Sequence, residues 1–123
     1  MVGYFYIFGT IFFTVYGQIV LKWRMNGIGS LPDGGVVDKV IFLIKVLFDP
    51  WVFSGFFAAF IASFFWMAAM TKFDISYAYP FMSGAFVLVF LLSVVLFNEP
   101  ITWQKVAGLL LIVAGIIVTS RSL

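Results

Sequence analysis

Four long stretches of this 123-residue chain carry almost no charge, and they constrain its fold more than any other feature. Residues 1–21, 50–71 and 75–98 contain no charged side chain, and residues 100–120 contain only Lys105. A helix needs about 20 residues to cross the roughly 30 Å of hydrocarbon in a bilayer, so each stretch is long enough to span it. The sequence therefore predicts four transmembrane helices, at about residues 2–22, 50–71, 75–98 and 101–120.

The composition agrees with this prediction and excludes several classes of function. Charged residues make up 10% of the chain, whereas a soluble domain carries about 25%. The chain has no His and no Cys, which excludes a Ser/His/Asp triad, a thiolate nucleophile and a zinc site of the usual ligands. Its seven basic residues are dispersed and form no nucleic-acid-binding patch. We expect an integral membrane protein that is not an enzyme and has no metal, cofactor or nucleic-acid partner.

The connection between the first and second spans holds most of the remaining charge. Residues 26–35 have the Gly, Pro, Asn and Asp content of a loop. Residues 36–48 are mostly apolar but too short to span, which predicts a short interfacial helix, with an extension of the second span as the alternative. The other connections are short, so we expect antiparallel neighbours. The predicted architecture is an all-α membrane protein, a single four-helix domain over residues 1–123 with a loop and interfacial helix at 23–49.

Small residues at regular spacing predict close helix packing. Gly108 and Gly115 lie two turns apart in the fourth span, and we expect that face to meet another helix. The second span has small residues four positions apart, which suit contacts within the chain or in a dimer. Four short helices enclose little room for a substrate, so their size favours a dimer, either a homodimer or a heterodimer with a related small subunit.

Several polar side chains lie inside the predicted spans. Thr10, Thr14 and Gln18 follow one another at four-residue steps in the first span, and Tyr79 and Ser83 lie on one side of the third. Polar groups at this depth usually face protein or a watery cavity, although hydroxyl groups also bond back to their own helix. Gln18 is the strongest candidate, because an unpaired amide is costly in lipid.

The charged residues favour an anionic substrate over a cationic one. Every carboxylate lies outside the predicted spans or at a span end, whereas a proton-coupled exporter of cations needs one within the membrane. Lys22, Arg24 and Lys105 are expected at one membrane interface, where they suit a phosphate head group. The alternative is that these cations only snorkel and set the topology.

Two stretches resemble a known family. Ile75-Ser-Tyr-Ala-Tyr-Pro-Phe-Met-Ser-Gly84 and the segment from Phe97-Asn-Glu-Pro to Gly108-Leu-Leu-Leu-Ile-Val-Ala-Gly resemble spans three and four of the drug/metabolite transporter superfamily. The closest likeness is to its four-helix members, the small multidrug resistance proteins and the subunits of the aminoarabinose-lipid flippase. With Gly17 and Lys22 included, the resemblance covers nearly the whole chain apart from a longer first loop.

The departures from the multidrug members indicate which branch is nearer. Their essential Glu of the first span falls at Thr14, which argues against proton/drug antiport. The Tyr-Pro pair at 79–80 and the Gly-Gln pair at 17–18 look more like the flippase subunits. The resemblance implies movement of an undecaprenyl-phosphate-linked sugar across the bacterial inner membrane by a pair of small subunits. It also implies that Trp66 and Tyr79 form aromatic walls that stack on the sugar.

The sequence thus predicts a multi-pass inner-membrane flippase that works by alternating access. Its expected partners are the lipid-linked sugar, membrane lipids and a second subunit. Phosphate is expected at Lys22, Arg24 and Lys105, while the prenyl tail stays in lipid. The expected sugar path is lined by Thr10, Thr14, Gln18, Trp66, Tyr79 and Ser83. The alternatives are an exporter of a small cation or other metabolite, and a non-transporting accessory subunit of a glycosyltransferase complex.

Overall fold

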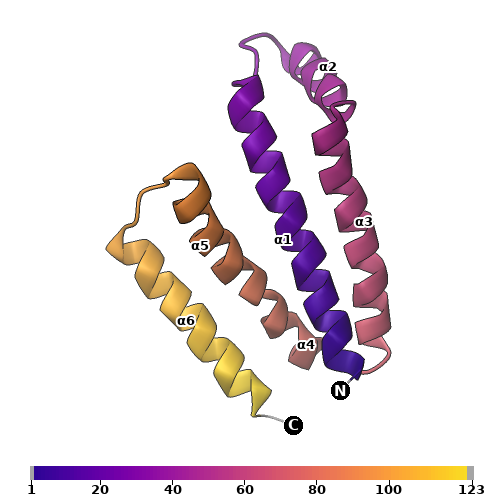
Figure 1. Cartoon of the computed structure of the whole chain (residues 1–123), viewed down its shortest axis with the longest axis vertical. Helices are drawn as coiled ribbons and strands as arrows, with labels where there is room; N and C mark the ends of the chain where they lie inside the picture. The colour runs from indigo at the N-terminus through magenta and orange to yellow at the C-terminus, as the bar shows by residue number, and fades with distance from the viewer. Residues whose placement is uncertain (1, 122–123) are drawn as a thin grey trace.

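The computed structural model describes residues 2–121, and every regular element in that range is an α-helix (Figure 1). Four helical segments are long and apolar enough to cross a membrane: α1, α3, the consecutive helices α4 and α5 taken together, and α6. This confirms the predicted all-helical fold with four candidate transmembrane helices. The helices are α1 (Val2–Ile28), α2 (Val36–Leu47), α3 (Pro50–Met70), α4 (Ile75–Met82), α5 (Gly84–Phe97) and α6 (Trp103–Ser120).

The path of the chain brings the start of α1 and the end of α6 to the same end of the molecule. In Figure 1 the chain ascends α1, descends α3, ascends through α4 and α5, and descends α6. The short helix α2 lies at the opposite end, where α1 finishes and α3 begins. It covers nearly the range predicted for the interfacial helix, and its location at a membrane surface stays a prediction.

The first helix is longer than the sequence predicts. The predicted first span ends at residue 22, whereas α1 continues through residues 23–28, which are predicted to belong to the connection. The backbone N–H of Gly29 still donates to the carbonyl oxygen of Met25 at 3.0 Å, so the helical hydrogen bonding runs past the turn-forming residues. Gly29 itself has a φ of 109°, a left-handed conformation that favours glycine and ends helices. Arg24, predicted to lie beyond the first span, therefore lies on the same helix as Lys22.

Capping residues fix the starts of α3 and α6. The Asp49 side chain accepts hydrogen bonds from the backbone N–H groups of Trp51 and Val52, at 3.0 and 3.3 Å, and Pro50 occupies the first turn of α3. Thr102 accepts from the backbone N–H of Lys105 at 3.2 Å. Each cap satisfies N–H groups that have no partner within the helix, which is why these helices start where they do.

The third predicted span is divided into α4 and α5 at Ser83. Pro80 lies inside α4 and has no backbone N–H, so it cannot bond to the carbonyl oxygen of Ser76. The backbone N–H of Ser83 donates to the carbonyl oxygen of Pro80 at 3.0 Å, a tighter turn than the α-helical one. The third span therefore has a break one turn after its proline.

The packed core lies toward the end of the molecule where α1 begins. α1 is the central helix, packing along α3 and also contacting α4 and α5. Tyr4 and Tyr77 lie at this end and share a hydrogen bond between hydroxyl oxygens 2.7 Å apart. The buried residues of the core come from the first half of α1, the end of α3, and α4 and α5: Ile7, Ile11, Val15, Ala69, Ala78 and Ala85.

The last helix packs far less. α6 contacts α4 and α5, yet none of its residues is buried. A Cβ atom added to Gly108 or Gly115 would meet no atom within 4 Å in the part of the chain that the structure describes. The helix that we expect to meet this glycine face is therefore not supplied from within residues 2–121.

Candidate functional site

α1 and α3 come into backbone contact at two glycines, Gly17 and Gly55. A Cβ atom on Gly17 would lie 2.9 Å from the carbonyl oxygen of Gly55, and one on Gly55 would lie 3.2 Å from the carbonyl oxygen of Gly17. Ordinary van der Waals contact begins at 3.4 Å, so a Cβ at Gly17 would force the backbone to move and a Cβ at Gly55 would be tighter than an ordinary contact. The two helices can approach this closely because glycine occupies both positions.

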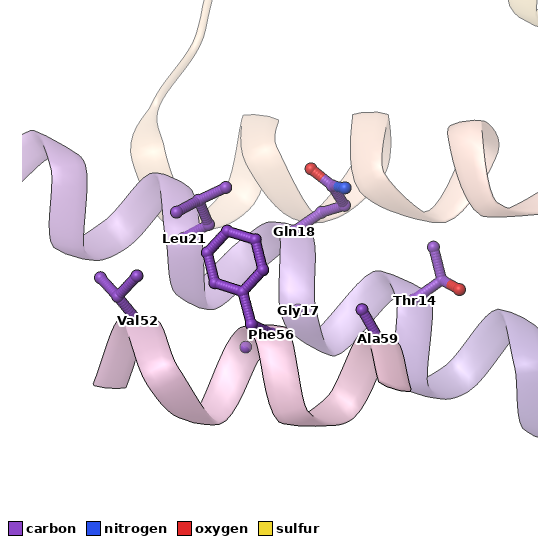
Figure 2. Close-up of a pocket in the computed structure, with 8 residues that line it drawn as sticks. Thr14, Gly17, Gln18, Leu21, Val52, Phe56 and Ala59 are labelled. Atoms are coloured by element: carbon purple, nitrogen blue, oxygen red, sulfur yellow. The ribbon is translucent and has the colours of Figure 1, made fainter. Parts of the chain in front are cut away.

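A small cavity of about 70 Å³ lies beside this contact. In Figure 2, Thr14 and Gln18 project from α1 to the same side, and the Phe56 ring rises from α3 next to Leu21. The hydroxyl and the amide are the polar side-chain groups of the cavity, and the other side chains that line it are apolar. The lining residues are Thr14, Gly17, Gln18, Leu21, Val52, Gly55, Phe56 and Ala59.

The polar side chains of this cavity are neutral and form no side-chain hydrogen bond in the part of the chain that the structure describes. Neither Thr14 nor Gln18 has a side-chain hydrogen-bond partner within residues 2–121, and Gln18 is exposed. All five carboxylates of the chain lie outside the four candidate spans. The cavity therefore contains an amide and a hydroxyl, each of which can donate and accept hydrogen bonds, and it contains no negative charge.

The structure does not bring the other four predicted path residues to this cavity. Thr10 is buried, and its hydroxyl donates to the carbonyl oxygen of Tyr6 in its own helix at 2.8 Å. Trp66 and Tyr79 contact each other edge to face, with ring centroids 5.8 Å apart. Ser83 lies at the break between α4 and α5. Of the six predicted path residues, Thr14 and Gln18 line this cavity.

The three predicted phosphate ligands have different environments. Arg24 forms an ion pair with Asp49, with its Nε donating to Oδ1 at 3.1 Å and its Nη2 to Oδ2 at 2.5 Å. The Lys105 ammonium donates to the carbonyl oxygen of Pro100 at 3.0 Å. Lys105 lies on α6, a helix that α1 does not contact. Lys22 is exposed and has no ion-pair partner in the described part of the chain. Lys22 is therefore the cation best placed to bind an anion beside the cavity.

The ion pair ties the end of α1 to the start of α3. The pKa of Asp49 lies below its ordinary value, first because Arg24 donates hydrogen bonds to it and also because the N–H groups of Val52 and Trp51 do. Burial opposes this shift. Asp49 thus serves as both helix cap and counter-ion, which leaves Arg24 partly neutralised.

Sequence reasoning misses two features of the site. The pairing of Arg24 with Asp49 joins residues 25 positions apart, and no local pattern predicts it. Phe56 is one of 17 phenylalanines, so its type does not distinguish it. The small-residue spacing around Gly55 does signal a close helix contact, and the structure places that contact within the chain.

Comparison with known families identifies the family of this chain. Residues 1–121 match the model of the EamA-like transporter family. The chain belongs to the EamA-like transporter family. Membership confirms the resemblance to the drug/metabolite transporter superfamily, and with the four apolar spans it identifies a multi-pass protein of the bacterial inner membrane.

Curated members of this family resemble the chain over most of its length. The probable 4-amino-4-deoxy-L-arabinose-phosphoundecaprenol flippase subunit ArnE of Pseudomonas aeruginosa strain UCBPP-PA14 is 36% identical over 116 residues, which cover 94% of this chain and 95% of that protein. A second kind of subunit, the probable 4-amino-4-deoxy-L-arabinose-phosphoundecaprenol flippase subunit ArnF of Aeromonas hydrophila, is 31% identical, over 92% of this chain and 76% of that protein. ArnF of Shewanella sediminis is 38% identical, over 81% and 74%. No solved structure matches the chain.

Proposed function

We propose that this EamA-like protein is one subunit of a flippase that moves a polyprenyl-phosphate-linked sugar across the inner membrane. The observation that carries the proposal is the neutral polar pair Thr14 and Gln18 in a cavity between spans that contain no carboxylate. Sugar hydroxyl groups both donate and accept hydrogen bonds, as do an amide and a hydroxyl. The relatives named as phosphoundecaprenol-linked aminoarabinose flippase subunits support the same substrate class.

The spacing along α1 suits a sugar joined to a phosphate. Thr14, Gln18 and Lys22 lie four residues apart, so their Cα atoms rise along the helix in steps of about 6 Å on nearly one face. A sugar hydrogen-bonded to Gln18 places its phosphate toward Lys22, at the membrane interface. A lysine ammonium there stabilises the phosphate as a point charge. Arg24 contributes less in this arrangement, because Asp49 already neutralises part of its charge.

The cavity of one chain is too small for this task. Ligand sites usually enclose about 300–1,000 Å³, against about 70 Å³ here. We therefore infer that a second subunit, an identical copy or a related one, completes the chamber. The glycine face of α6, with Gly108 and Gly115, is the surface proposed to pack against it, because small residues permit close helix contact in lipid.

A transport assay tests the proposal. Purified protein in liposomes is expected to speed the appearance of a short-chain polyprenyl-phosphate sugar in the outer leaflet, measured with an external sugar-modifying probe. Gln18→Leu removes the amide and is expected to slow flipping about fivefold, the value of one lost neutral hydrogen bond. The matched control is Asn26→Leu, which removes from the same helix an exposed amide that does not line this cavity. Equal rates for the two variants would contradict the assignment of Gln18.

The same assay separates the alternatives. Cation efflux without lipid flipping would favour an exporter of the small multidrug resistance type, and neither activity would favour an accessory subunit. Lys22→Gln is expected to slow flipping, and a wild-type rate in that variant would remove the phosphate role. Comparing Asp49→Asn with the double variant Arg24→Gln/Asp49→Asn tests Arg24 separately from the ion pair, because both variants lack the pair and they differ only at residue 24.

A further inference from the structure

A second and larger cavity, of about 420 Å³, lies among α1, α2 and α3. One wall comes from α2, where Val40, Leu43, Ile44 and Leu47 follow the i, i+3, i+4, i+7 spacing of a single helix face. Every residue that lines the cavity is apolar. These four α2 side chains are 39 to 49% exposed, so α2 presents an apolar face that the chain itself leaves only half covered.

The apolar cavity adjoins the polar one. Leu21, Val52 and Phe56 line both. A molecule that reaches from Gln18 past the Phe56 ring therefore passes directly from a neutral polar compartment into an apolar one. This order of surfaces matches an amphiphile with a polar head and a hydrocarbon tail.

Three lysines are sequence neighbours of residues that line the apolar cavity. Lys22 follows the lining residue Leu21, and Lys39 and Lys45 adjoin lining residues of α2. All three lysines are exposed and have no ion-pair partner within residues 2–121. Asp38 is the acidic residue of α2. Three exposed lysines without ion-pair partners, on α1 and α2, two of the helices that wall the cavity, complement a lipid whose head group is anionic.

We propose that the cavity among α1, α2 and α3 holds the first isoprene units of the substrate's polyprenyl tail while the sugar occupies the Gln18 cavity. This rests on the proposed function and replaces the expectation that the whole tail stays in lipid. An apolar cavity of about 150 Å³ holds one benzene molecule, so about 420 Å³ has room for two or three five-carbon isoprene units. The rest of the tail extends into the bilayer.

The substrate tail is favoured over the acyl chain of an ordinary phospholipid. The two cavities share three lining residues, so the head of a molecule whose tail lies in the apolar one is within reach of Thr14 and Gln18. Those groups suit a sugar better than a second phosphate, because they carry no positive charge. The phosphate that joins tail and sugar then lies near Lys22.

Photocross-linking tests the location of the tail without requiring transport. The probe is a polyprenyl phosphate with a benzophenone in its second isoprene unit, added to the full-length protein in liposomes of zwitterionic lipid. Labelled peptides are expected from residues 36–47 of α2. Leu43→Trp fills the cavity and is expected to lower labelling about tenfold, as overpacking an apolar site does. Ile41→Trp is the matched control, because Ile41 is also 46% exposed on α2 but lines no part of the cavity.

The outcomes distinguish this proposal from the proposed function. Labelling of α2 that is competed by unlabelled polyprenyl phosphate but not by phosphatidylglycerol supports it. Equal competition by phosphatidylglycerol would indicate a general lipid site and overturn it, as would labelling confined to other helices in the wild type. Equal labelling of Leu43→Trp and Ile41→Trp would also overturn it. Specific labelling of α2 in a protein that flips no lipid-linked sugar would instead refute the proposed function and leave the tail site standing.

Discussion

The backbone contact between α1 and α3 predicts that a single added methyl group at Gly17 destabilises the protein. In Gly17→Ala the new Cβ lies 2.9 Å from the carbonyl oxygen of Gly55, short of the 3.4 Å of ordinary contact by about 0.5 Å. The opposing atom belongs to the backbone, so no side-chain rotation relieves the clash and the two helices must separate. Overpacking of this kind costs about 1–3 kcal/mol. We expect the free energy of unfolding to fall by that amount.

The measurement is unfolding in mixed micelles of a mild detergent and SDS, followed by far-ultraviolet circular dichroism. Gly55→Ala is expected to be milder, because its Cβ would lie 3.2 Å from the carbonyl oxygen of Gly17. Gly27→Ala is the matched control, since Gly27 lies on α1, no atom of residues 2–121 lies within 4 Å of its added Cβ and alanine favours helix. If Gly17→Ala proves as stable as Gly27→Ala, the close approach of α1 and α3 is not a feature of the folded protein.

Two further predictions use the same unfolding assay. The pKa of Asp49 is lowered by its hydrogen bonds from Arg24, so its stabilising effect is present above its ordinary pKa of 3.8 and is lost as the pH falls through the lower folded-state value. Asp49→Asn is expected to reduce stability at neutral pH and to lessen the further loss below about pH 4; an unchanged acid profile would exclude this role. Tyr4→Phe leaves the buried Tyr77 hydroxyl without its partner and is expected to cost about 1 kcal/mol, whereas an equal loss in Tyr6→Phe would show that the hydrogen bond is not the cause.

The membrane spans and the family could be predicted from the sequence because they depend on local properties. A charged side chain is costly in hydrocarbon wherever the helix packs, so the long uncharged stretches mark the spans without knowledge of their neighbours. The same reasoning predicts the absence of carboxylates from the spans, which the structure confirms. It misjudges the end of the first helix, because helical hydrogen bonds continue through Asn26 and Gly27 until Gly29 adopts its left-handed conformation.

The site depended on tertiary structure, because the direction that a polar side chain faces is set by what its helix packs against. Thr10, Thr14 and Gln18 form one polar stripe in the sequence, yet the core covers Thr10 while Thr14 and Gln18 face the cavity beside the Gly17–Gly55 contact. The folded chain likewise gives Arg24 a counter-ion from the start of α3 and leaves Lys22 unpaired in residues 2–121. Sequence alone determined which segments enter the membrane, since burial in lipid depends on each segment's own side chains. Packing alone decided which polar side chains of these segments remain free to bind a ligand, since that depends on the helices that contact them.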